Sequence, residues 1–310
     1  MNFILRKLKL KISSLIAPEL RNFRFLVGQA AILSSRANSE SFKNLWDAEV
    51  KVYSQWGEDG ILDYLCEQVG LSKPKVIEIG AGNFSECNSR FLAENRNASV
   101  FAVDGRDDLV TSVESNSLRS KNHIFSYQTW VSPQNINQII AKAQTSIGNI
   151  DIFSLDLDGN DYWILQEANL ESVGIVVVEY NPLFGHLNAV SVPRDDKFDR
   201  KSKHYSWLYY GASLKAFEYL LDKKDFQFIG TNRVGNNAFF VRKKLATKIR
   251  IEPNADYSIY TDWRVRETRS KAGKLTFASG YERVSEISTL PLVDVATGNA
   301  ISVGEANPST

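Results

Sequence analysis

Acidic side chains follow two apolar segments in the middle of the chain. Asp156 and Asp158 lie at the end of one segment, and Glu179 and Asn181 lie at the end of the next. If the segments are neighbouring parallel strands about 4.8 Å apart, alternate residues share a face, and the four side chains converge at one edge of the sheet. Carboxylate and amide oxygens are the ligands that Mg²⁺, Mn²⁺ and Ca²⁺ prefer. One hypothesis is therefore a divalent-metal site made by these four residues.

The same residues also allow chemistry without a metal. Carboxylates this close raise one another's pKa, so Asp158 is a candidate general base. His186 is a second candidate for proton abstraction, because an unperturbed imidazole titrates near neutral pH, or else it is a surface histidine in a loop. In the remaining alternative, Asp158 and Asp161 cap the helix that follows, and Glu179 contacts a cofactor or substrate.

A loop with two glycines forms a second candidate site. Glu78, Gly80, Gly82 and Asn83 come at the end of another apolar segment. Glycines at a strand-to-helix turn let the backbone approach a ligand closely. A dinucleotide-binding loop has a third glycine where this chain has Ser85, and an acidic residue at position 78 is unusual there. The loop therefore favours a cofactor that has an amino group and no pyrophosphate.

Asp104 ends the next apolar segment, in Val103-Asp104-Gly105-Arg106. A carboxylate about 20 residues beyond such glycines is where a ribose diol is bound. Alone, the glycines or the carboxylate indicate no more than a tight turn and a helix cap. Together, in this order on consecutive strands, they predict a site for a ribose-containing cofactor.

Alternating strands and helices must position these residues. Short apolar runs predict five parallel strands at residues 75–80, 99–104, 123–127, 151–157 and 174–180. Helical stretches between them are expected near residues 86–94, 106–117, 133–145 and 160–169. A helix at 212–221 then precedes a β-hairpin formed by 226–230 and 237–242. The pattern predicts an α/β, Rossmann-like, doubly wound sheet that is mostly parallel and ends in an antiparallel hairpin.

The chain divides into three parts. Residues 1–50 form a helical extension, residues 51–245 the α/β domain, and residues 246–310 a C-terminal extension with a basic cluster. Within the domain, the irregular, aromatic and charged segment 181–211 is predicted to be an insertion on the substrate side.

Composition excludes several classes of protein. The 310 residues include 37 basic and 36 acidic ones, a formal net charge of +1 that argues against a nucleic-acid partner. Apolar residues are 43% of the chain and charged residues 24%, which excludes wholesale disorder. Cys66 and Cys87 cannot form a disulfide framework, and no apolar run reaches the ~18 residues of a spanning helix, so a cytoplasmic location is expected.

Residues 1–24 carry an amphipathic pattern. Ile4, Leu8, Ile12 and Leu15 share one helical arc, with basic residues outside or at the edge of it. One interpretation is a helix on the anionic inner face of a membrane. The alternative is a helix that packs on its own domain or on a second chain in a homo-oligomer.

The sequence resembles class I methyltransferases that use S-adenosylmethionine, and more narrowly the FkbM-type family and its bacterial relatives near surface-glycan genes. The resemblance rests on the predicted hairpin and on segments 53–61, 78–88, 155–162, 209–214 and 237–242. It implies an O-methyltransferase whose acceptor is a carbohydrate or a lipid-linked glycan. The chain departs from the family at Asp156-Leu157-Asp158-Gly159, where FkbM-type proteins usually have Asp-x-Glu-Gly.

The resemblance also implies roles for individual residues. Glu78, Gly80 and Gly82 would lie against the methionine part of the cofactor, Asp104 would hold the ribose, and Asp156 would face the amino group or a metal. The full set of implied cofactor contacts is Glu78, Gly80, Gly82, Asn83, Asp104, Gly105, Trp130 and Asp156.

Two other classes of function stay open. One is a nucleotide-sugar oxidoreductase on a Rossmann sheet, against which Ser85 and the hairpin count. The other is a binding protein that keeps the fold without catalysis, against which the intact acidic loop and strand ends count.

Overall fold

The structure is a computed structural model, which describes residues 22–115, 123–254 and 267–307. Most of the predicted amphipathic segment 1–24 therefore lies outside the described residues. Seven strands form the main sheet: β1 (Lys75–Ile79), β2 (Ser99–Asp104), β3 (Ile124–Gln128), β4 (Ile152–Leu155), β5 (Ile175–Glu179), β7 (Phe226–Thr231) and β8 (Asn237–Arg242).

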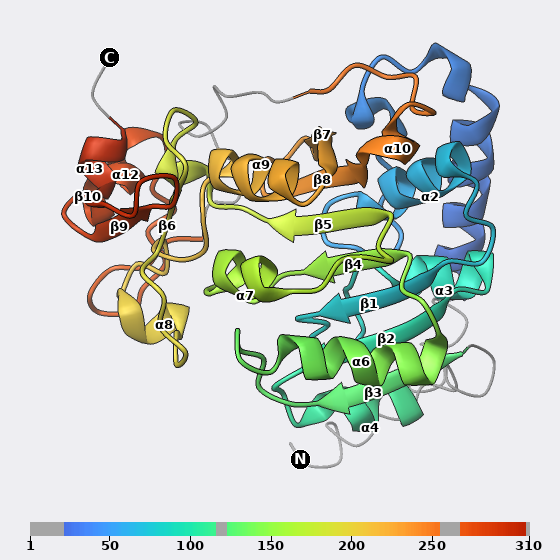
Figure 1. Cartoon of the computed structure of the whole chain (residues 1–310), viewed down its shortest axis with the longest axis horizontal. Helices are drawn as coiled ribbons and strands as arrows, with labels where there is room; N and C mark the ends of the chain where they lie inside the picture. Colours follow the sequence, from blue (N-terminus) through green and yellow to red (C-terminus); the bar gives the residue numbers. More distant parts are fainter. Residues whose placement is uncertain (1–21, 116–122, 255–266, 308–310) are drawn as a thin grey trace, which may run out of the picture.

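The sheet order is β3-β2-β1-β4-β5-β8-β7 (Figure 1). Strands β1 to β5 are parallel, β8 runs antiparallel to β5, and β7 runs antiparallel to β8. The last two strands are the predicted hairpin, and β8 is inserted between β5 and β7. The predicted doubly wound, mostly parallel sheet with a terminal antiparallel hairpin is confirmed.

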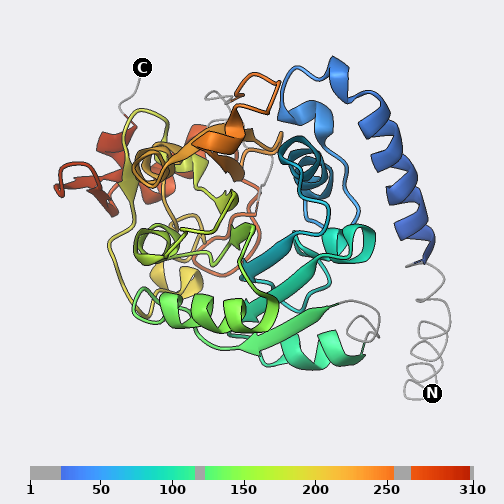
Figure 2. The same cartoon turned by 45° about the vertical axis from the view of Figure 1, so that its right-hand side comes forward.

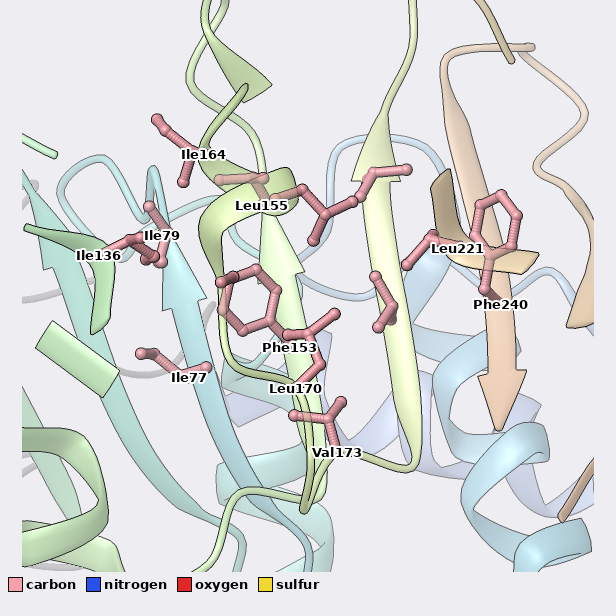
Figure 3. Packing of buried hydrophobic residues seen from close by; sticks show 14 of the residues in the cluster. Ile77, Ile79, Ile136, Phe153, Leu155, Ile164, Leu170, Val173, Leu221 and Phe240 are labelled. Atoms are coloured by element: carbon pink, nitrogen blue, oxygen red, sulfur yellow. The ribbon is translucent and has the colours of Figure 1, made fainter. Parts of the chain in front are cut away.

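Helices cover both faces of this sheet. One face carries α2 (Glu58–Val69), α3 (Arg90–Arg96) and α4 (Asp108–Ser115), and the other carries α6 (Ile136–Ile147), α7 (Asp161–Glu167) and α9 (Leu214–Lys223). Because side chains alternate along a strand, Ile77 and Phe153 face α6 and α7, whereas their neighbours Val76 and Ile152 face the other layer (Figure 3). Burial on both faces explains the unbroken apolar runs of the central strands.

A second, smaller unit lies beyond the carboxyl ends of the strands, and we call it the cap. It comprises residues 181–211 and 281–306, which share one hydrophobic core. Its elements are η3 (Pro182–Phe184), β6 (Val190–Ser191), α8 (Arg200–Lys203), α12 (Tyr281–Ile287), β9 (Pro291–Asp294), β10 (Ala300–Ser302) and α13 (Val303–Ala306). The strand order β10-β9-β6 joins the insertion to the C-terminal extension. From the sequence, the insertion and the C-terminal extension were expected to be separate parts.

The N-terminal extension packs on the outside of the domain. A helix at residues 22–37 is followed by η1 (Ser39–Ser41) and η2 (Leu45–Ala48), and it lies beside α2 and α3 (Figure 2). A short helix, α10 (Lys243–Ala246), follows β8. Among the described residues, no helix combines the length and apolar character that crossing a membrane requires. Cys66 and Cys87 are both free and buried.

Candidate active site

A cavity of about 630 Å³ lies at the carboxyl ends of β1, β2, β4 and β5, between the sheet and the cap. This is the edge at which α/β sheets bind ligands, and the volume is typical of a small-molecule site. Its lining includes Gln55, Gly80, Gly82, Asp104, Gly105, Arg106, Trp130, Asp156, Asp158, Glu179, Phe198, Arg200, Tyr210, Asn236 and Glu267. Eight predicted site residues belong to this lining, whereas Glu78, Asn83, Asn181 and His186 do not.

The two glycines of the loop differ in the space around them. Gly80 has φ +88°, and a Cβ there would lie 1.6 Å from the carbonyl oxygen of Asp156. This close approach brings the end of β1 against the end of β4. Gly82 has φ +56°, and a Cβ there would meet nothing within 4 Å, so its backbone faces open space on the cavity wall. Such a surface fits the close approach of a cofactor.

The Asp104 carboxylate joins the two loops of this wall. Its Oδ2 accepts a hydrogen bond from the Gly82 amide at 2.7 Å, and its Oδ1 accepts one from the Arg106 amide at 2.8 Å. These bonds fix the carboxylate at the cavity surface. Each carboxylate oxygen has a further lone pair, which can accept a ribose hydroxyl.

Trp130 lies at the rim of the cavity. Its side chain is 58% exposed, and its indole N–H donates to the Asp196 carbonyl at 3.2 Å. A Cβ at Gly105 would lie 3.3 Å from the Trp130 ring, so the glycine lets the indole pack closely over the backbone. An exposed, oriented indole can stack on a planar ring.

Glu78 is turned away from the cavity, which corrects its implied contact with the cofactor. The buried carboxylate accepts hydrogen bonds from the amides of Asn88 and Ser89 at 2.7 and 2.9 Å, and from the Ser89 hydroxyl. It thereby holds the amino-terminal end of α3, and burial raises its pKa. Asn83 also serves the loop itself, because its side-chain oxygen accepts from the Ser85 amide at 3.1 Å.

Three carboxylates meet on the opposite wall. Oxygens of Asp156, Asp158 and Glu179 all lie within 4.8 Å of one another. Burial, together with repulsion from the neighbouring carboxylates, raises the pKa of Asp156 and of Glu179 well above the usual range. Carboxyls with a raised pKa are suited to accept a proton from a bound hydroxyl.

Arg200 reaches this cluster from α8 of the cap. Its guanidinium is ion-paired with Asp158 and lies 3.9 Å from the centre of the Tyr210 ring. Desolvation alone would lower the pKa of Arg200, but the surrounding anionic groups raise it, so the side chain stays charged. Arg200 was not predicted as a site residue, because its position depends on how the insertion folds back over the sheet.

Asp158 and Asp161, two further acidic residues after β4, have different roles. Asp161 accepts hydrogen bonds from the amides of Leu157 and Gly159 at 2.8 and 2.9 Å, and burial raises its pKa to about 6. Asp158 has φ +56° and is directed toward Arg200. Asp161 is therefore the residue that fixes the turn, and Asp158 is the one that faces the cavity.

Asn181 lies outside the acidic cluster, which corrects its place in the predicted metal site. Its buried side chain donates to the carbonyls of Leu208 and Tyr210, both at 2.9 Å, and accepts from the Leu183 amide at 3.0 Å. Strand alternation predicted a shared face with Glu179, but β5 ends at Glu179 and the chain turns there. The amide instead anchors the segment that carries Tyr210.

His186, the second predicted base, belongs to the cap. It follows η3 in the cap, where the neighbouring Asn188 donates to the Ala306 carbonyl of α13 at 3.1 Å. Since His186 is not part of the cavity lining, its predicted role as a base is not supported by this geometry.

A buried polar network holds a further part of the wall. Glu58 is fully buried and accepts from the side-chain amides of Asn232 and Asn237 at 2.7 and 2.9 Å. It ties the start of α2 to the hairpin turn, and this places Gln55 and Asn236 at the cavity.

Comparisons with known proteins show similarity at the level of fold. No family model and no curated protein matches the chain. A putative caffeoyl-CoA O-methyltransferase from Staphylococcus aureus aligns with 72% of this chain and 98% of its own, at 11% identity and a TM-score of 0.41. An S-adenosylmethionine-dependent methyltransferase from Clostridium acetobutylicum aligns with 63% of this chain and 93% of its own, at 12% identity and a TM-score of 0.39.

TehB from Haemophilus influenzae is 16% identical, with a TM-score of 0.35, over 58% of this chain. The alignment spans 61% of the TehB chain. The strand topology defines the fold independently of these alignments. Five parallel strands in the order β3-β2-β1-β4-β5, closed by the antiparallel β8 and β7, define a class I methyltransferase fold.

Proposed function

We propose that the protein is an S-adenosylmethionine-dependent O-methyltransferase whose acceptor is a hydroxyl of a carbohydrate or glycan. One observation carries the proposal: a single cavity joins the Gly82–Asp104 wall to the Asp156–Glu179 pair. The first can hold a ribose-containing cofactor, and the second can take a proton. The acceptor class rests on the family resemblance, and the aromatic rings of Phe198 and Tyr210 in the cavity support it.

When bound, S-adenosylmethionine supplies an electrophilic methyl group. The backbone at Gly82 would admit the cofactor closely, Asp104 would accept the ribose hydroxyls, and Trp130 would border the adenine. The enzyme's main contribution to such a displacement is to hold two reactants in line. The cap completes the cavity on the acceptor side through Arg200 and Phe198.

A sugar hydroxyl is a poor nucleophile at neutral pH, so its proton must be removed. Asp156 and Glu179 suit this task, because burial raises the pKa of both carboxyls toward the working pH of a general base. Asp158 was the base expected from sequence. Its charge is compensated by Arg200, so we assign proton transfer to the Asp156–Glu179 pair and acceptor positioning to Asp158.

A metal-assisted version is favoured by one observation, the convergence of three carboxylate oxygens within 4.8 Å. Asp156, Asp158 and Glu179 would hold Mg²⁺ or Mn²⁺, which would polarise the acceptor oxygen. Asp158 would then have to exchange its contact with Arg200 for the ion. This makes the two versions separable by chelation.

The test is methyl transfer from radiolabelled S-adenosylmethionine to a panel of neutral, amino and acidic oligosaccharides, with and without chelator. Label in a saccharide supports the proposal, and labelled product that survives chelation selects the metal-free version. Loss on chelation and recovery with Mg²⁺ or Mn²⁺ selects the metal-assisted one. If the protein binds NAD(H) and transfers no label, the oxidoreductase alternative replaces the proposal. If it binds S-adenosylmethionine without transfer to any acceptor, a binding role replaces it.

A further inference from the structure

The N-terminal helix at residues 22–37 presents apolar side chains on two opposite sides. One side packs on the domain, where Ile32 joins a buried cluster with Val52, Tyr53 and Phe91. Gly28 allows the close approach, because a Cβ there would lie 2.5 Å from Val52. The helix is therefore a fixed part of the molecule in its described residues.

The opposite side of this helix faces solvent. Nine large apolar side chains are exposed in the described part of the chain, and four of them lie here: Phe23 (67%), Leu26 (61%), Val27 (52%) and Leu33 (63%). We call these four residues the outer face. At 100° per residue they share an arc of about 120°, which Ala30, Ser34 and Ala37 complete without any charged side chain. A contiguous apolar surface of this kind marks an interaction site.

The charge of the adjoining sequence indicates what that partner is. Residues 1–24 contain six basic residues and one acidic residue, which leaves 31 basic and 35 acidic residues for the rest of the chain. Residues 20–39 contain no Asp or Glu. In sequence, the excess of positive charge therefore adjoins the largest group of exposed apolar side chains in the described part of the chain. In sequence, residues 4–16 continue the same apolar spacing.

We infer that the outer face binds the surface of an anionic lipid membrane. An interfacial helix combines an apolar face that enters the boundary between headgroups and acyl chains with basic residues that attract anionic lipid. A second copy of the chain is a poorer partner, because its own basic segment would repel this one. A neutral apolar partner would leave the concentration of positive charge without a counterpart.

The position of the helix allows lipid binding to be measured separately from catalysis. The helix lies at the edge of the domain, beside α2 and α3, whereas the cap lies on the far side, beyond the carboxyl ends of the strands (Figure 1, Figure 2). Substitutions in the outer face therefore leave the cavity untouched. The inference does not depend on the proposed methyl transfer.

The experiment is flotation of the full-length protein with phosphatidylcholine vesicles that contain or lack phosphatidylglycerol. We expect binding to the anionic vesicles, which weakens as salt is raised. The double substitution Phe23→Ser with Leu26→Ser should weaken this binding about a hundredfold, since two large apolar side chains no longer enter the bilayer. The matched control is Leu187→Ser, which removes a side chain that is 60% exposed in the cap.

Three results would overturn the inference. One is equal flotation of the wild type and the double variant, and another is equal binding to vesicles with and without phosphatidylglycerol. The third is a lipid-free dimer in sedimentation velocity that the double variant converts to monomer, because a second copy would then occupy the outer face. Since both replaced side chains are exposed, unchanged thermal unfolding of the variant confirms that the fold is intact.

Discussion

The two halves of the cavity are built in different ways. In the cofactor half, Gly80, Gly82 and Asp104 are held by backbone geometry and by hydrogen bonds within two adjacent loops. In the acceptor half, Asp156 and Glu179 lie on strand ends, but Arg200 arrives from the cap. In the function we propose, the sheet would hold the cofactor and the proton acceptor, while the cap would determine which acceptor molecule fits.

The largest effect should come from the pair that joins these halves. Asp156→Asn or Glu179→Gln should each lower turnover roughly a thousandfold, about 4 kcal/mol of barrier, because proton transfer is assigned to the two carboxyls acting together and each substitution removes one of them. Cofactor affinity should not change. Initial rates and calorimetry measure the two quantities, with Glu171→Gln, an exposed carboxylate outside the cavity, as the control. Near-normal turnover in both variants would mean that another group is the general base.

The next largest effect concerns the cofactor half. Gly80→Ala should destabilise the protein by at least about 3 kcal/mol, because its Cβ would overlap the Asp156 carbonyl at 1.6 Å. Gly70→Ala is the matched control. Gly70 also has a positive φ, +83°, but no atom lies within 4 Å of its Cβ, so about 1 kcal/mol is expected. Urea unfolding measures the stability of both variants. An equal loss of unfolding free energy in the two would mean that the β1–β4 contact is not rigid.

A smaller effect should follow from changing the cap. Arg200→Ala removes the ion pair with Asp158 and the contact with Tyr210. It should raise the acceptor KM about tenfold and leave the cofactor Kd unchanged. Lys203→Ala serves as the control, because Lys203 belongs to the same short helix and pairs with Asp195 instead. If Arg200→Ala weakened cofactor binding and left the acceptor KM unchanged, the division into two halves would fail.

The last prediction concerns the pH dependence of the free energy of unfolding, which Asp59 in α2 should influence. Asp59 is fully buried, and burial raises its pKa to about 6, although one of its oxygens accepts bonds from the amides of Val52, Tyr53 and Ser54. The unfolded chain has a pKa near 3.9 for this group, so the native state binds the proton more tightly. Its stabilising contribution is present below about pH 4 and is lost as pH rises through about 6.

Asp59→Asn keeps an acceptor oxygen and removes the titration. Between about pH 4 and 6, the free energy of unfolding of the wild type should fall more steeply than that of the variant, by at most about 1.4 kcal/mol per pH unit. Urea unfolding across this range measures the difference in slope. Parallel curves would show that Asp59 is ionised in the native state throughout.

The sequence predicted the sheet, because strands depend on local signals, and six of the eight predicted cofactor contacts line the cavity, whereas Glu78 and Asn83 do not. Apolar runs define the strands, and the spacing from Gly82 to Asp104 reflects two consecutive strand ends. The acceptor half was predicted only in part. Asn181 was expected at the site because alternation was extended past the end of β5, where the chain turns into η3, and His186 because an imidazole titrates near neutral pH. Arg200 could not be predicted, because it depends on packing between residues 181–211 and 281–306.

Calorimetry can show whether the Gly82–Asp104 wall binds the ribose of S-adenosylmethionine, as we propose. The wild type should bind S-adenosylmethionine and its demethylated product, and it should not bind NAD(H). Asp104→Ala should weaken binding at least about tenfold, since each charged hydrogen bond contributes roughly 1.5–3 kcal/mol, while the exposed Asp107→Ala should bind normally. Unchanged affinity in a folded Asp104→Ala variant, or tight binding of NAD(H) by the wild type, would show that this wall does not bind the ribose of S-adenosylmethionine.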